Sequence, residues 1–112
     1  RDAYKCYRAK TTKDRPKHIK QVLALSDENG PRNATATKPL AVCAPVAIDG
    51  APIVNADTYL TCYQTKDSKG QAPITARTVT VSSTLGAEIL ATSGPTMLCV
   101  PSQRLEPTAP AD

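Results

Sequence analysis

Short runs of alternating apolar and polar residues cover most of the chain and predict β-strands, since successive side chains of a strand point to opposite faces. None of these runs has the length or the period of an amphipathic helix. The alternation predicts strands over residues 3–9, 18–26 and 40–43 in the first half and over residues 58–65, 74–82, 88–91 and 96–100 in the second. The clearest strand is 77–81, where Arg-Thr-Val-Thr-Val combines alternation with β-branched residues.

Polar segments with Gly, Pro, Asn and Asp separate these runs and predict turns and connections. Residues 10–17 hold four basic residues and no apolar anchor, so we expect an exposed connection. Residues 27–31 predict a turn, with Gly30 followed by Pro31 as its signal. Residues 33–39 predict a polar segment that leads to a short strand. Residues 47–56 predict a wrapping connector in which Ile53 and Val54 form a short edge strand.

The chain contains an internal repeat, in which one sequence unit occurs twice. A shift of 56 residues places Cys6 on Cys62 and Cys43 on Cys99 without a gap. Nine positions are identical under this shift: Cys6/Cys62, Tyr7/Tyr63, Lys10/Lys66, Lys13/Lys69, Ser26/Ser82, Gly30/Gly86, Pro39/Pro95, Cys43/Cys99 and Pro45/Pro101. This internal repeat predicts a duplicated supersecondary unit.

Length and composition indicate that the two repeats share one core. The chain has 112 residues, so each half alone would bury too little surface to be stable. We therefore predict a single domain over 1–112 that consists of repeat 1 (1–56), repeat 2 (57–101) and an extended tail with two prolines (102–112). The chain has no Trp and no Phe, so the core is expected to consist of Val, Leu, Ile and Ala. The expected fold is all-β, a small sandwich or barrel-like domain with pseudo-two-fold duplication and two disulfides.

Four isolated cysteines in a small chain predict a disulfide framework and an oxidising compartment. Their spacing does not resemble that of zinc ligands, which cluster in pairs. The pairings Cys6–Cys43 with Cys62–Cys99 and Cys6–Cys99 with Cys43–Cys62 both treat the repeats as equals. We favour the first, tandem pairing because a unit that once stood alone would have needed its own bridge.

The net charge of +4 is concentrated in repeat 1, where residues 1–56 carry ten Lys and Arg against five Asp and Glu. Residues 57–112 carry four against five. The basic residues lack the interleaved aromatics of a nucleic-acid surface, so we expect no nucleic-acid partner and at most weak binding of anionic polymers by repeat 1. No apolar run is long enough to predict a membrane span. The start at Arg1, without an apolar leader, leads us to expect a processed, exported product.

Candidate chemistry is sparse. His18 is the only imidazole, and no glycine-rich or nucleophile-elbow context accompanies the serines, so no catalytic residue, cofactor or metal site is predicted. Asp27 and Glu28 could contribute to a calcium site, but the matching residues of repeat 2 lack carboxylates. Asn33-Ala34-Thr35 is a possible glycosylation acceptor, and otherwise an ordinary loop segment.

The repeated motifs resemble an uncharacterised duplicated module of exported bacterial proteins, marked by K-C-Y, a strand ending in a Gly turn, and L-C-x-P. The matching residues are Lys5-Cys6-Tyr7, Gly30 and Val42-Cys43-Ala44-Pro45 in repeat 1, and Thr61-Cys62-Tyr63, Arg77–Val81, Gly86 and Leu98-Cys99-Val100-Pro101 in repeat 2. This chain has Asn29 and Leu85 where the module usually carries an aromatic residue before Gly. The resemblance implies secretion and a disulfide-bonded β-fold, and it brings no enzymatic residues.

These observations lead us to expect a secreted, non-enzymatic structural protein of the cell surface. Open β edges are natural sites for strand addition, and the extended tail could reach a neighbour, so we expect its copies to associate through β-edge or tail contacts into a filament or another homopolymer. The alternative is an extracellular recognition or adhesion module that binds a glycan or a protein, although few aromatic residues are available to stack on sugars.

Overall fold

The computed structural model describes residues 2–28, 30–94 and 97–105, and it is all-β. The strands are β1 (Ala3–Arg8), β2 (Gln21–Asp27), β3 (Gly30–Val46), β4 (Thr58–Asp67), β5 (Arg77–Ser83), β6 (Gly86–Thr92) and β7 (Met97–Gln103). The predicted all-β class with two repeats and two disulfides is therefore confirmed, and the described strands do not close into a barrel.

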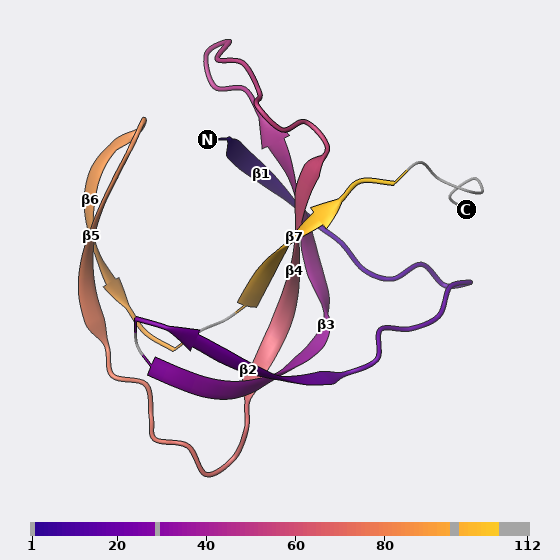
Figure 1. Ribbon diagram of the computed structural model, residues 1–112, viewed down its shortest axis with the longest axis vertical. Coiled ribbons are helices and arrows are strands. Elements are labelled where there is room, and N and C mark those ends of the chain that lie inside the picture. The colour runs from indigo at the N-terminus through magenta and orange to yellow at the C-terminus, as the bar shows by residue number, and fades with distance from the viewer. Residues whose placement is uncertain (1, 29, 95–96, 106–112) are drawn as a thin grey trace.

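The strands form a five-stranded sheet and a separate hairpin. In the sheet, neighbouring strands follow the order β1-β3-β4-β7, and β2 pairs with β3 beyond the end of β1. The second sheet is the β5–β6 hairpin, which stands apart from the five-stranded sheet on the left of Figure 1. All pairings are antiparallel.

The register of repeat 2 is that of repeat 1 with 56 added to each residue. Cys6 pairs with Cys43 and Cys62 pairs with Cys99. In the hairpins, Asp27 pairs with Gly30 as Ser83 pairs with Gly86. Both glycines have φ above +100°, a region that residues with a Cβ rarely adopt, which explains why Gly recurs after each turn. The 17 residues of β3 correspond to β6 and β7 together.

Several predicted boundaries were wrong. The segment 33–39 was predicted to be a polar connection, yet it lies within β3, because β2 pairs with one edge of it and β4 with the other. Pro39 is tolerated there because it lies at a register shift, where a backbone donor is not required. β2 and β5 each begin three residues later than predicted. Residues 53 and 54 belong to no strand, and β7 extends into the predicted tail as far as Gln103.

The buried core is small. Among the described residues only Ala34, Ala36, Cys43 and Cys62 are buried, with 1–5% of their surface exposed. All four lie on β3 and β4. Val, Leu, Ile and Ala were expected to form this core. Two alanines do, but the Val, Leu and Ile side chains of the described residues stay half-buried or exposed.

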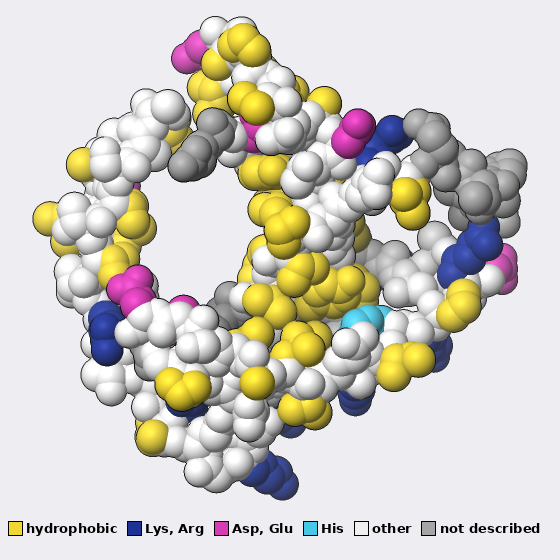
Figure 2. Space-filling model, viewed as in Figure 1, with side chains coloured by type: hydrophobic (Ala, Val, Ile, Leu, Met, Phe, Trp, Pro, Cys, Tyr) yellow, Lys and Arg dark blue, Asp and Glu magenta, His cyan; other side chains and the backbone are white. Residues whose placement is uncertain are grey.

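The molecule is thin and open for its length. Its extents are 45 × 38 × 18 Å, and its radius of gyration is 16.6 Å, against about 13 Å for a compact domain of this size. Figure 2 shows an open space between the β5–β6 hairpin and the five-stranded sheet. Every residue of β6, and all of β5 except Val79, is exposed. The hairpin therefore gains little from packing.

Replacing both cysteines of either disulfide by alanine is expected to destabilise the protein strongly. Each bridge spans 37 residues, which corresponds to about 3.8 kcal/mol in the chain-entropy model. Urea unfolding of the two double variants, after peptide mapping of the remaining bridge, measures the loss. Because the two loops are equally long, the losses should be similar, and a loss below about 1 kcal/mol in either variant would contradict this account.

Candidate functional site

The four cysteines form two disulfides that lie next to each other across the five-stranded sheet. The disulfides are Cys6–Cys43 and Cys62–Cys99, which is the favoured tandem pairing. Each joins residues that face each other on neighbouring strands, with Cα–Cα distances of 3.8 and 3.9 Å. Between the two bridges, Sγ of Cys43 lies 3.7 Å from Sγ of Cys62. The disulfides thus join β1 to β3 and β4 to β7 covalently, and the two bridges contact each other across the β3–β4 pairing.

The seam between β3 and β4 joins the two repeats. Residues 34–43 of β3 pair with residues 60–67 of β4, with register shifts on both sides of Lys38 and Pro39. The Thr37 hydroxyl donates to the side-chain oxygen of Gln64 at 2.9 Å beside these shifts. Every buried side chain of the described residues belongs to this seam.

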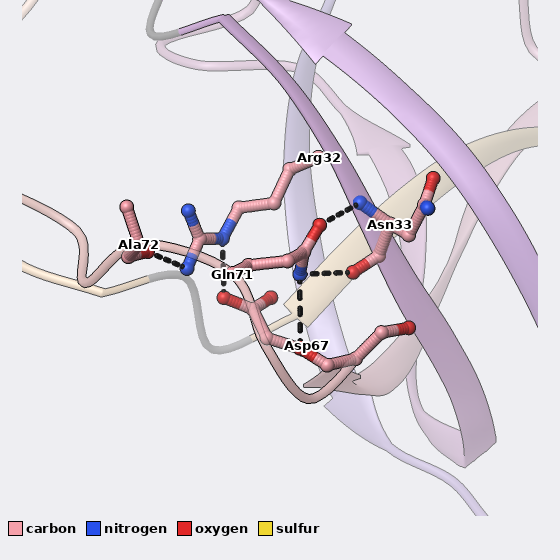
Figure 3. A network of polar contacts seen from close by, with 6 residues as sticks. Arg32, Asn33, Asp67, Gln71 and Ala72 are labelled. Atoms are coloured by element: carbon pink, nitrogen blue, oxygen red, sulfur yellow. Dashed lines mark hydrogen bonds and ion pairs between the residues drawn. The ribbon is translucent and has the colours of Figure 1, made fainter.

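A polar network fastens the loop after β4 to the start of β3, as Figure 3 shows. The guanidinium of Arg32 donates from Nε to the Asp67 carboxylate and from Nη2 to the carbonyl of Ala72. The side chain of Gln71 accepts from the backbone N–H of Asn33 at 2.7 Å and donates to its carbonyl at 2.8 Å. This side-chain amide therefore extends the strand pairing beyond the end of β4.

In repeat 1, a contact between two rings holds the connection between β1 and β2 against β4. The basic loop, which we define as residues 9–20 between β1 and β2, ends near His18. The His18 ring packs on Tyr63 of β4 with 5.1 Å between centroids, and its Nε2 donates to the carbonyl of Ala36 at 3.0 Å. His18 is thus a packing residue of the seam, and its loop lies against the next repeat.

The strand β1 leaves one edge open. In an antiparallel strand, the N–H and C=O of one residue point to the same side, and successive residues alternate. Ala9, which follows β1, donates its N–H to the Leu40 carbonyl of β3 at 2.9 Å. The backbone groups of Tyr4, Cys6 and Arg8 therefore point away from β3, toward the side on which no described strand pairs with β1.

The strand β7 leaves the opposite edge open. Arg104, which follows β7, donates its N–H to the carbonyl of Asp57 at 3.1 Å. By the same alternation, the backbone groups of Met97 and Cys99 point away from β4. No described strand pairs with that side of β7. The path β1-β3-β4-β7 therefore ends in open edges on both sides.

The possible glycosylation acceptor Asn33 lies on β3 rather than in a loop. Asn33 is exposed, and its side chain points away from the polar network in Figure 3. The Gln71 contacts hold only its backbone. The side-chain amide is therefore accessible from solvent, whereas the backbone around it is held in a sheet.

Two hollows flank the seam. The larger, of about 690 Å³, lies between the β2–β3 hairpin, residues 72–77 and β7, and it includes Arg32, Asp67 and Arg77. The smaller, of about 580 Å³, lies under the basic loop and includes Lys10, Arg15 and His18 among mostly basic residues. Within the described ranges, no three His, Cys, Asp or Glu residues converge in a way that could hold a metal ion. Those ranges also contain no helix of membrane-spanning length and hydropathy.

Sequence reasoning found the cysteines and the repeat, and it missed the contacts that join the repeats. Nothing in the pattern of Arg32, Asp67 and Gln71 indicates that they meet, because they belong to different repeats and their contact depends on the β3–β4 register. The one available signal was their position along the chain, since Arg32 follows the Gly30 turn and Asp67 lies two residues after the end of the predicted strand 58–65.

Comparison of the chain with family models, with curated proteins and with solved structures finds no match. The resemblance to an exported bacterial module therefore stays a prediction.

Replacing Arg32 by alanine is expected to release the loop after β4. The Arg32 and Asp67 side chains are 23% and 27% exposed, so their ion pair is partly shielded, and its loss should cost about 1 kcal/mol. Amide hydrogen exchange should then speed up at Ser68, which donates to the Asn33 carbonyl in the intact protein. Arg77→Ala, on an exposed residue bordering the same hollow, is the control. Unchanged exchange at Ser68 would show that the pair does not hold the loop.

Asp2 is expected to titrate below the usual aspartate range. Its carboxylate accepts the backbone N–H groups of Val54 at 2.7 Å and Asn55 at 2.8 Å, and these bonds lower its pKa from 3.8. A lowered pKa means that the bonds stabilise the fold above pH 3.8 and are lost as the pH falls through the folded-state value. NMR titration should show the Asp2 carboxyl and both amides shifting together below pH 3.8. In Asp2→Asn, both amide transitions should disappear.

Proposed function

We propose that this protein is a secreted, non-enzymatic structural protein whose copies join through open strand edges into an extracellular filament or cell-surface assembly. The observation that carries the proposal is that the path β1-β3-β4-β7 ends on both sides in an edge with which no described strand pairs. Each edge presents backbone donors and acceptors aligned for another strand. Because the two edges belong to different strands, a contact between them is head-to-tail, and it builds an open filament when the rotation from one copy to the next does not close a ring.

The disulfides support an extracellular location. All four cysteines of the chain are bridged, and such pairs persist in oxidising compartments. The disulfides also suit a load-bearing subunit, because each of them covalently joins neighbouring strands of the sheet. Two of the three contacts along the path β1-β3-β4-β7 are thereby covalent, and only the β3–β4 contact depends on pairing and packing.

The open shape supports the same role. A molecule 18 Å thick with four buried residues among those described has a small core, and contact with neighbours would bury more. A binding function instead would draw on the hollow of about 690 Å³ beside β7, with Arg32 and Asp67 in its wall. We favour the structural role because those two side chains already bind each other.

The basic loop gives the protein a weak affinity for anionic polymers. Lys10, Lys13, Arg15, Lys17 and Lys20 are all exposed. Such a cluster attracts anionic polymers at low ionic strength, and salt screens the attraction.

Purified protein is expected to form linear polymers that weaken on reduction. Sedimentation across a concentration series and negative-stain electron microscopy, with and without reductant, measure this. Reduction should act by loosening β1 and β7, the strands that carry the open edges, from the rest of the sheet. Monomer-sized particles at every concentration would contradict the proposal, and a clear hit on a glycan array by such a monomer would support the recognition role instead.

A further inference from the structure

We propose that the partner at each open edge is a second copy of this chain, and that β1 of one copy pairs with β7 of the next, and residues 9–11 with β6, in the register that β4 uses on β3. This inference rests on the proposed function and names the surfaces that form its contact. It follows from the repeat, because residues 2–11, which comprise β1 and the first residues of the basic loop, correspond to β4, and β6 with β7 corresponds to β3.

The residue pairs of the proposed contact are obtained from those of the seam by shifting each strand by the repeat length of 56 residues. Ala41 pairs with Cys62 and Cys43 pairs with Leu60 in the seam. Adding 56 on the β3 side and subtracting 56 on the β4 side places Met97 opposite Cys6 and Cys99 opposite Tyr4 of the next copy. The backbone groups of these four residues all point to the open edges, as derived above from the bonds of Ala9 and Arg104.

Burial shows which contacts are missing at these edges. The four buried residues, Ala34, Ala36, Cys43 and Cys62, all lie at the seam. Their counterparts under the shift are Leu90, Thr92, Cys99 and Cys6, and all four are exposed. The same residue type, cysteine, is 1% exposed where the seam covers it and exposed where no strand does.

Side-chain chemistry at the shifted positions is complementary. His18 packs on Tyr63 in the seam, and the counterparts are Ile74 and Tyr7 of the next copy, an apolar pair in which Tyr7 is now 54% exposed. Leu90, 46% exposed, takes the place of the buried Ala34. The contact would thus cover apolar surface that the single copy leaves in water.

Charge is also complementary. The Arg32–Asp67 pair of the seam corresponds to Glu88 and Thr11 of the next copy. Thr11 lies in the basic loop, beside Lys10 and Lys13, so the carboxylate of Glu88 would meet a cationic loop. The excess charge of repeat 1 is therefore placed where the acidic residue of β6 would face it.

A double-mutant cycle at positions 88 and 11 tests the register. Glu88→Arg should raise the critical concentration for assembly about tenfold or more, because it brings like charges together. Thr11→Asp should weaken assembly for the same reason, against Glu88. The double variant recreates the Arg32–Asp67 pair between copies and should restore assembly to within about twofold of wild type. Glu28→Arg, alone and with Thr11→Asp, is the control, since Glu28 lies in the other hairpin turn and should show no coupling.

Isotope-mixed cross-linking tests the same contact without substitution. Equal amounts of ¹⁴N- and ¹⁵N-labelled protein are assembled and treated with a carbodiimide, which joins a carboxylate to an amine. Mixed-isotope peptides should link Glu88 to Lys10 or Lys13. Polymers without these links, or without coupling in the cycle, would overturn this register and leave the proposed function standing. Absence of any polymer would overturn both, and mixed-isotope links between two identical edges would show a closed dimer and overturn the inference.

Discussion

The structure depends on the pairing of β3 with β4, because it is the only contact along the path β1-β3-β4-β7 that no disulfide secures. Both bridges lie within repeats, so the repeats are held together by backbone hydrogen bonds, four small buried side chains and the polar contacts around them. Small residues are suited to this position. Ala34, Ala36 and the cysteines allow the side chains of adjacent strands to approach, as the 3.7 Å between Sγ of Cys43 and Sγ of Cys62 illustrates.

The repeat explains how such a small core supports an ordered sheet. Each repeat contributes one strand pair closed by a disulfide and one hairpin closed at a glycine with positive φ. These units are local and largely specified by their own residues. The seam then needs only to align two units that are already formed, and loop residues from each side, His18 and Gln71, extend its length.

The sequence predicted what is local and repeated. The period of 56 was read from spacing, the Gly30 and Gly86 turns from residue type, and the tandem pairing from the argument that a unit that once stood alone would have needed its own bridge. Each of these features repeats in the strand register. It did not predict that residues 33–39 are strand, because their Thr and Ala residues alternate weakly and Pro39 argues against a central strand. Only the presence of β4 on the other side decides that question, and that is a tertiary effect on local propensity.

The same tertiary effect accounts for the difference between the two repeats. Residues 30–46 form one strand in repeat 1, where β4 lines them from Ala34 to Cys43. The equivalent residues of repeat 2 form two strands, β6 and β7, and β6 diverges from the sheet with its hairpin in Figure 1. The two segments are equal in length and share a register with their own partners, but only the first has a strand along its second edge. The local sequence of a repeat therefore specifies its hairpin and its disulfide pair, whereas the continuity of its long strand depends on a neighbour.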